Sequence, residues 1–159
     1  MNNQDPYQLY GRQILITGAS SGIGRACAVL FAGRGASLCL LGRDETRLHE
    51  TLSLTDMPNK HCSVSVDLTD YKCVADTVRE LVKERGPISG IVNCAGISTT
   101  VPLNATTEEK MDHFIRTNVI GPLSLTCLLY TSDAADDLLC VDPGCRRLIK
   151  KKKTIHHAH

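Results

Sequence analysis

The chain has 159 residues, of which 42% are hydrophobic and 22% charged, and its formal net charge is +1. This composition indicates one globular domain, and the near-neutral balance argues against a nucleic-acid-binding protein, which would carry a strongly basic domain. No run of about 18 apolar residues occurs, and residues 1–11 hold no basic or apolar stretch. We therefore predict no membrane span and no secretory signal, which favours a cytoplasmic protein.

Strand and helix patterns alternate over residues 1–126. Strands are predicted at 13–17, 37–41, 62–66 and 88–93, and the segments between them carry apolar residues at helical spacing. Asp44 is the predicted N-cap of the second helix, and Thr106 with Glu109 predicts a capping box for the helix after the fourth strand. This alternation predicts an α/β fold, a Rossmann-like doubly wound parallel sheet, truncated after the fourth strand and the following helix.

The eight cysteines do not form a recognisable framework. None belongs to a Cys-x-x-Cys pair, and most lie in apolar runs, where a free cysteine behaves as a small hydrophobic residue. Without a secretory signal we expect free thiols in a reducing compartment. We also predict no metal site, because no zinc-type cluster occurs in the first 126 residues.

A glycine-rich segment, residues 17–24, follows the first predicted strand and opens a predicted helix. Gly18 permits a tight turn, Gly22 lets the backbone approach a pyrophosphate, and Gly24 allows the helix to pack closely on the strand. Free N–H groups at the start of the helix would face the phosphates. The predicted cofactor-binding residues of this segment are Thr17, Gly18, Ser20, Ser21, Gly22, Ile23 and Gly24. The alternative is an ordinary glycine-rich turn.

Four motifs together resemble the short-chain dehydrogenase/reductase family. The first is the Thr-Gly-x-x-x-Gly-x-Gly spacing of the glycine segment. The others are Asp67-Leu68, which resembles the family's adenine-contacting pair, Asn93-Cys94-Ala95-Gly96, which is similar to Asn-Asn-Ala-Gly, and Thr117-Asn118-Val119, which matches the family's helix asparagine. The resemblance covers residues 10–126. It implies hydride transfer between a nicotinamide cofactor and a carbonyl compound or secondary alcohol, with Asp67, Leu68, Asn93, Ala95 and Gly96 at the cofactor.

The end of the second strand predicts the choice of cofactor. An acidic residue there would accept hydrogen bonds from the ribose hydroxyls of NAD. Arg43 stands there instead, and its guanidinium can make a forked contact with a 2′-phosphate. We therefore expect NADP in preference to NAD. The alternative is a solvated arginine paired with Asp44.

Asn118 is the catalytic-site residue that the resemblance implies. In the family this asparagine holds a water that links the catalytic lysine to solvent in a proton relay. An asparagine in a helix can also simply bond a kinked backbone, and Pro122 removes the N–H that would bond the Asn118 carbonyl. The water relay and the kinked backbone are compatible, because the resemblance implies that the main-chain carbonyl at the kink binds the water.

The family's catalytic serine, tyrosine and lysine are expected to be absent. The family uses a tyrosine as general acid, with a lysine four residues later. Tyr130 is the only tyrosine after Asn118, it falls within the same predicted helix, and Ala134 stands where the lysine should be. We therefore divide the chain into a partial NAD(P)-binding domain, residues 1–126, and a tail, residues 127–159, and expect the chain as written to be inactive.

The tail has the pattern of a foreign sequence. Residues 127–136 correspond codon for codon to a transposase adaptor used in sequencing libraries, and the lysines at 150–153 correspond to translated oligo-A. The alternatives are a basic patch at Arg146-Arg147 and the lysines, or metal binding by the terminal histidines. We therefore do not expect the tail to form part of the fold.

Three hypotheses follow. The first is the amino-terminal part of an NADP-dependent short-chain oxidoreductase, with 3-oxoacyl-thioester reductase as one possible type. Its parent would act on a small carbonyl or alcohol substrate and, by resemblance, form a homo-oligomer. The second is a non-catalytic NADP-binding module. The third is a chain that does not fold, because a half-sheet leaves an unpaired edge strand and exposed apolar faces.

Overall fold

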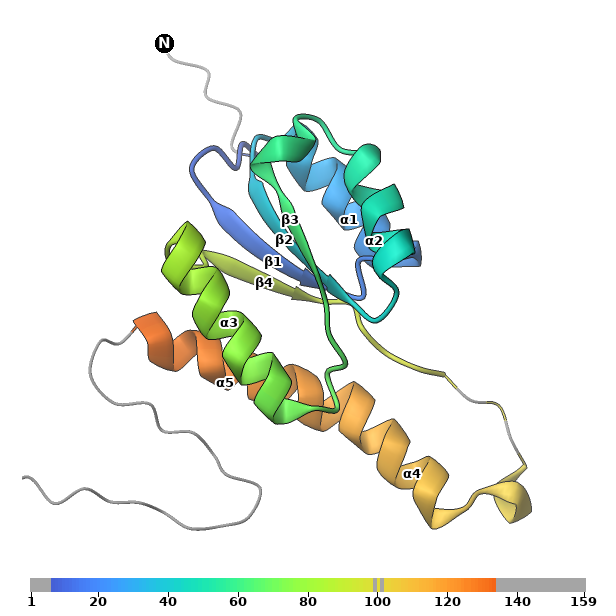
Figure 1. Cartoon of the computed structure of the whole chain (residues 1–159). Helices are drawn as coiled ribbons and strands as arrows, with labels where there is room; N and C mark the ends of the chain where they lie inside the picture. The colour runs from blue at the N-terminus through green and yellow to red at the C-terminus, as the bar shows by residue number, and fades with distance from the viewer. Residues whose placement is uncertain (1–6, 99, 101, 134–159) are drawn as a thin grey trace, which may run out of the picture.

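Four parallel strands form the centre of the structure, a computed structural model that describes residues 7–98, 100 and 102–133. These strands are β1 (Gln13–Thr17), β2 (Ser37–Gly42), β3 (Cys62–Ser65) and β4 (Gly90–Asn93). Their order in the sheet is β3-β2-β1-β4, so the chain winds outward from β1 in both directions (Figure 1). The predicted Rossmann-like doubly wound sheet is confirmed.

Helices cover both faces of this sheet (Figure 1). α1 (Gly22–Gly33) and α2 (Glu45–Ser53) lie on one face, and α3 (Tyr71–Arg85) and α5 (Gly121–Asp133) lie on the other. α4 (Glu108–Ile115) continues through a π-helical turn, Arg116–Ile120, into α5. Short 3₁₀ turns occupy Pro58–Lys60 and Leu103–Ala105. No helix in the described part of the chain is long and apolar enough to cross a membrane.

The strands supply two separate cores because successive side chains point to opposite faces of a sheet. Leu15 and Leu41 are at most 1% exposed and join the core under α3 and α5. Ile16, Leu38 and Leu40 are fully buried and join the core under α1 and α2. A parallel sheet covered on both faces needs apolar residues at successive positions, which explains the short apolar runs in the sequence.

Of the two helix caps that the sequence predicted, the one at Asp44 is confirmed and the one at Thr106 is wrong. The Asp44 carboxylate accepts from the Arg47 N–H at 3.0 Å, as predicted. The capping box does not form at Thr106, because α4 begins one residue later. Thr107 is extended, with φ −98° and ψ 159°, and its hydroxyl accepts from the Lys110 N–H at 3.3 Å. The Thr106 hydroxyl instead donates to the Pro102 carbonyl at 3.4 Å.

The predicted kink before Pro122 takes the form of the π-helical turn, where the Gly121 N–H donates to the Arg116 carbonyl. α5 then runs on past position 126, and Leu125 and Leu128 are 0% and 4% exposed in the core beside α3. The helix therefore crosses the predicted boundary between domain and tail. Residues 134–159, most of that tail, lie outside the described residues.

Candidate functional site

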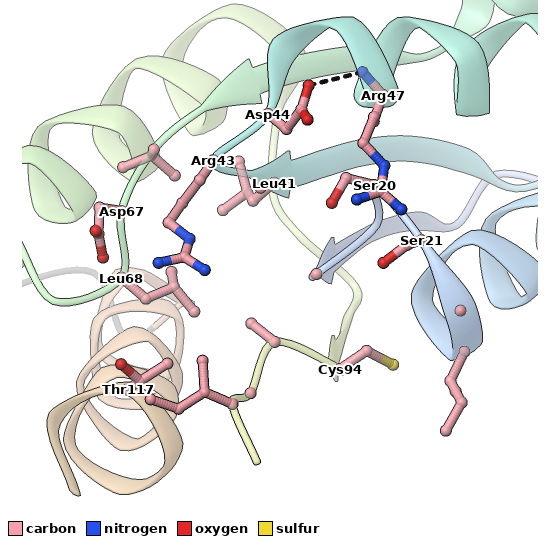
Figure 2. Close-up of a pocket in the computed structure, with 18 of the residues that line it drawn as sticks. Ser20, Ser21, Leu41, Arg43, Asp44, Arg47, Asp67, Leu68, Cys94 and Thr117 are labelled. Atoms are coloured by element: carbon pink, nitrogen blue, oxygen red, sulfur yellow. Dashed lines mark hydrogen bonds between the residues drawn. The ribbon is translucent and has the colours of Figure 1, made fainter. Parts of the chain in front are cut away.

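A cleft of about 840 Å³ opens where the strands end, at the place where doubly wound sheets bind ligands. Figure 2 shows the cleft surrounded by the ends of the strands, the start of α1 and the helix that carries Thr117. Most of the residues predicted at the site line it, namely Gly18, Ser20, Ser21, Gly22, Ile23, Arg43, Asp67, Leu68, Ala95 and Gly96. Thr17, Gly24, Asn93 and Asn118 are not among the lining residues.

The three glycines of the segment after β1 have different physical roles. Gly18 has a φ of 64°, and a Cβ there would lie 2.7 Å from the Ala95 nitrogen. A Cβ at Gly24 would overlap the Gly18 carbonyl, so α1 packs directly on the turn. Gly22 has a φ of 52°, but its missing Cβ would meet nothing within 4 Å. Gly22 therefore presents bare backbone at the cleft, and a ligand can approach it closely.

Thr17 lies beneath the cleft and connects two of its loops. Its side chain is 0% exposed, and its hydroxyl oxygen accepts from the N–H groups of Cys94 and Ala95, each at 3.1 Å. The hydroxyl lies 3.5 Å from the Val92 carbonyl, to which it donates. Thr17 thus holds the loop after β4 against the end of β1.

Arg25 joins the glycine segment to α2 and was not predicted. Its Nη2 donates to the Ser20 carbonyl at 2.7 Å and to Glu50 at 3.1 Å, and its Nε donates to the Thr51 hydroxyl at 3.0 Å. The Thr51 hydroxyl donates in turn to the Ala19 carbonyl at 2.9 Å. Arg25 and Thr51 are 26 positions apart, so no local pattern could have paired them.

Two arginines line the cleft, Arg43 on the side of Asp67 and Leu68 and Arg47 on the side of Ser20 (Figure 2). Arg43 follows β2, Arg47 lies in the first turns of α2, and Figure 2 shows Arg43 extending into the open space and Arg47 reaching toward Ser20. Arg47 was not predicted. The cleft is also lined by the acidic residues Asp44 and Glu45.

Asp67 lies at the end of β3, opposite the glycine segment. Its Oδ1 accepts from the Thr69 N–H at 2.9 Å and from the Thr69 hydroxyl at 2.8 Å. Burial works to raise the pKa of Asp67, but these two bonds and the charge of Arg43 together hold it below its ordinary value. Asp67 is therefore an ionised acceptor at the rim of the cleft, where Leu68 is 9% exposed.

The two predicted asparagines hold structure around the cleft. Asn93 donates through Nδ2 to the Thr126 hydroxyl at 3.3 Å, which ties β4 to α5. The Asn118 side chain donates to the Ile97 carbonyl at 2.9 Å and accepts from the Ile97 N–H at 2.8 Å. Its neighbour Thr117 lines the cleft, and the Thr117 hydroxyl is buried without a hydrogen-bond partner among the described residues.

Comparison with known proteins identifies the family. The family model for short chain dehydrogenase matches residues 12–134. The chain belongs to this family. Short-chain dehydrogenases use a nicotinamide cofactor, NAD or NADP, and act on small molecules.

Curated relatives share about a third of the aligned residues. Dehydrogenase/reductase SDR family member 7B of Danio rerio is 34% identical over 122 residues, which cover 71% of this chain and 39% of the relative. Gluconate 5-dehydrogenase of Gluconobacter oxydans is 35% identical over 120 residues, which cover 75% of this chain and 47% of the relative. The 3-dehydrosphinganine reductase of Danio rerio is 33% identical over 137 residues, which cover 80% of this chain and 40% of the relative. The chain thus spans less than half the length of these relatives.

Solved structures agree with this assignment. A short-chain type dehydrogenase/reductase from Mycobacterium marinum has a TM-score of 0.73 at 27% identity, with 79% of this chain and 51% of that chain covered. A citronellol catabolism dehydrogenase from Pseudomonas aeruginosa PAO1 has a TM-score of 0.71 at 28% identity, with 82% and 54% covered. The described residues correspond to about half of each of these proteins.

Proposed function

We propose that this chain is the cofactor-binding portion of an NADP-dependent short-chain oxidoreductase. The observation that carries the proposal is the cleft itself, which joins a bare backbone position at Gly22 to the guanidinium groups of Arg43 and Arg47. When bound, the cofactor supplies or accepts the hydride. The parent enzyme would exchange that hydride with a carbonyl compound or a secondary alcohol, and a 3-oxoacyl-thioester is one candidate substrate.

The glycine segment suits a pyrophosphate. N–H groups at the start of α1 are unbonded within the helix and carry the positive end of its dipole. Gly22 has no side chain to obstruct them, and the bonds from Arg25 and Thr51 to the carbonyls of Ser20 and Ala19 hold the segment in place. An anion of the size of a diphosphate can therefore contact the backbone at this end of the cleft.

Arg43 supports NADP over NAD. A 2′-phosphate beside Arg43 would gain charge-assisted hydrogen bonds, and Arg43 directly follows β2, where an acidic acceptor for the ribose hydroxyls of NAD would stand. We assign the adenine to the part of the cleft opposite the glycine segment, where the ionised Asp67 carboxylate can accept from its amino group and Leu68 offers an apolar contact.

Asn118 acts here as a positioning residue. Its side chain holds the loop at Ile97 beside the cleft, and the π-helical turn changes the bonding of its main chain. The family resemblance implies that this main chain binds the relay water, which we retain as a proposal for the parent. Asn93, bonded to α5, fixes the end of β4 beneath the same loop.

The alternative function is a non-catalytic NADP-binding module. It is favoured by one feature of the 159 residues: none of the four tyrosines is followed four positions later by a lysine, and Tyr130 is followed by Ala134. Tyr130 is also 81% exposed on α5 and does not line the cleft. Under either function we expect these 159 residues to bind the cofactor without turning over a substrate.

A titration tests the proposal. The chain is titrated with NADPH and with NADH, followed by cofactor fluorescence, and we expect tighter binding of NADPH. Arg43→Leu should weaken NADPH binding by about tenfold to a hundredfold, because that is the contribution of hydrogen bonds to a charged group. NADH binding should be unchanged, because NADH has no 2′-phosphate. Arg79→Leu is the matched control, because Arg79 is exposed on α3 and paired with Asp76 at 2.7 Å.

Two results would overturn parts of the proposal. Equal losses of NADPH and NADH binding in Arg43→Leu would remove the assignment to NADP while keeping a nicotinamide site. A folded chain that binds neither cofactor would remove both the oxidoreductase portion and the binding module.

A further inference from the structure

Two cysteines face each other across neighbouring strands, away from the cleft. Cys39 of β2 and Cys62 of β3 are direct partners in the parallel ladder. Cys39 is 1% exposed in the core under α3 and α5, and Cys62 packs against that same core. The two thiols therefore lie on one face of the sheet, on strands that Figure 1 shows side by side.

The ladder places these cysteines within reach of a covalent bond. Adjacent strands lie about 4.7–4.9 Å apart, and disulfides join residues whose Cα atoms are about 4.4–6.8 Å apart. β3 is at the edge of the sheet, and Cys62 is half-buried there, whereas Cys39 is covered. A small oxidant can thus reach Cys62 first.

The surroundings of Cys62 favour its thiolate. Arg85, at the end of α3, donates to the carbonyls of Lys60 at 3.3 Å and His61 at 3.5 Å, so its guanidinium lies over the start of β3. The hydrogen bond from the Cys39 thiol, followed by the charge of Arg85, lowers the pKa of Cys62 against the effect of burial. The hydrogen bond with the Cys62 thiol, followed by burial, raises the pKa of Cys39.

We propose that Cys62 and Cys39 form a hydroperoxide-reactive dithiol, in which Cys62 is the attacking thiol and Cys39 the resolving thiol. The Cys62 thiolate attacks one oxygen of hydrogen peroxide, the O–O bond breaks, and the released hydroxide takes a proton to give water. Cys62 is then a sulfenic acid. The Cys39 sulfur attacks it, the S–O bond breaks, and a second water leaves with the Cys39 proton. Two thiols are oxidised to one disulfide and one peroxide is reduced to two waters.

A second cysteine pair gives an internal comparison. Cys94 lines the cleft next to Cys27 of α1, but burial and the Cys27 thiol raise the pKa of Cys94. A protonated thiol is a poor nucleophile, so Cys94 should react after Cys62. The dithiol proposal concerns the opposite face of the sheet and does not depend on the proposed cofactor.

Peptide mapping tests the proposal directly. The reduced full chain is treated with one equivalent of hydrogen peroxide, capped with N-ethylmaleimide, digested and analysed by mass spectrometry. We expect the first cross-linked peptide to join Cys39 to Cys62 and to disappear on reduction with dithiothreitol. In Cys39→Ala, dimedone should trap a sulfenic acid on Cys62. In Cys62→Ala, neither the disulfide nor a sulfenic acid on Cys39 should form.

Three further variants test whether the reactivity of Cys62 depends on its surroundings and not only on its distance from Cys39. Arg85→Gln should slow the oxidation of Cys62 by up to about tenfold, because a pKa change of one unit changes the thiolate fraction tenfold, and Arg85→Lys should restore part of the rate. Cys73→Ser, which removes an exposed cysteine on α3, should leave rate and product unchanged.

The contrary results are equally definite. A first cross-link between Cys27 and Cys94, with Cys39 and Cys62 still capped by N-ethylmaleimide, would overturn the proposal. So would a Cys62 that survives peroxide unmodified in the wild-type chain, a result that requires no variant to fold.

Discussion

Asn118 and Ile97 bond each other twice, although 21 positions separate them. The Asn118 Oδ1 accepts from the Ile97 N–H at 2.8 Å, and its Nδ2 donates to the Ile97 carbonyl at 2.9 Å. A Cβ at the neighbouring Gly96 would lie 3.0 Å from the same Oδ1. Only a primary amide offers a donor and an acceptor side by side for this contact. The asparagine in the family motif thus fixes the loop after β4 onto the helix.

Asn118→Asp should therefore destabilise the chain. The substituted carboxylate keeps the acceptor for the Ile97 N–H but sets a second acceptor against the Ile97 carbonyl. We expect the free energy of unfolding in urea to fall by about 1–3 kcal/mol, and NADPH affinity to fall with it as the loop loosens. Asn59→Asp, at an exposed position, is the control. Equal stability of the two variants would contradict this role.

Thr17→Val tests the contact between β1 and the loop after β4. Valine has the shape of threonine, but it leaves the N–H groups of Cys94 and Ala95 without their acceptor. We expect the free energy of unfolding, measured in urea, to fall by about 1–3 kcal/mol, because buried donors without partners carry their full desolvation cost. Thr17→Ser keeps the hydroxyl and should recover most of it. If serine and valine cost the same, the hydroxyl has no such role.

The glycines of the segment after β1 should separate stability from binding. Gly18→Ala meets the backbone of Ala95 at a positive φ, and we expect it to cost about 2–4 kcal/mol of folding free energy. The Cβ of Gly22→Ala would meet no other atom, so the positive φ alone should lower the free energy of unfolding, by about 1–2 kcal/mol. The same Cβ would stand where a phosphate approaches the backbone, so we expect NADPH binding to weaken by about tenfold or more.

Gly90→Ala is the control for both glycine variants, since its Cβ would meet nothing within 4 Å and its φ is not positive. Thermal unfolding and cofactor titration on the three proteins check the pattern. Should Gly22→Ala bind NADPH like Gly90→Ala, a phosphate does not contact this backbone.

His61 should make stability depend on pH. It is 5% exposed, its Nδ1 accepts from the Leu38 N–H at 3.2 Å, and its Nε2 therefore carries the proton and donates to the Asp56 carbonyl at 2.9 Å. Burial, the largest effect, lowers the pKa of His61 below its ordinary value of 6.5. Protonation would place a donor against the Leu38 N–H.

Because the folded state favours the neutral ring, this stabilisation is fully present above the unfolded-state pKa of 6.5 and is lost as the pH falls through the lower folded-state pKa. We expect the free energy of unfolding to decrease below about pH 6.5, and His61→Gln to show a shallower decrease. Urea unfolding from pH 7.5 to 5 measures both. Parallel curves for the two proteins would exclude His61 as the source.

Exposed apolar residues on α4 and the following turn should promote association. Met111 is 48% exposed, Ile115 39% and Val119 50%. Apolar surface of this kind marks either an interface or an aggregation hazard. We expect concentration-dependent association in light scattering, reduced by Met111→Glu with Ile115→Glu. A wild-type chain that stays monomeric at high concentration and melts in one sharp transition would contradict this.

Local patterns were sufficient for most of the fold. The alternation of apolar runs with helical spacing predicted the four strands and the parallel sheet, because these periods depend on backbone geometry within a few residues. The spacing of Gly18, Gly22 and Gly24 predicted a strand-to-helix turn for the same reason. Where competing local signals were adjacent, as at Thr106 and Thr107, the sequence could not decide which residue caps the helix.

Contacts between distant residues required the folded chain. Thr17 was expected at the cofactor, yet it lies under the cleft and holds the loop that begins at Cys94. Arg25 bonds Thr51, Asn118 bonds Ile97, and Cys39 faces Cys62, at separations over which no period of a helix or strand extends. The sequence by itself determined the fold, the family motifs and the end of the sheet at which the cleft opens. Packing in three dimensions determined which side chains support that site, because each partner is supplied by a different element.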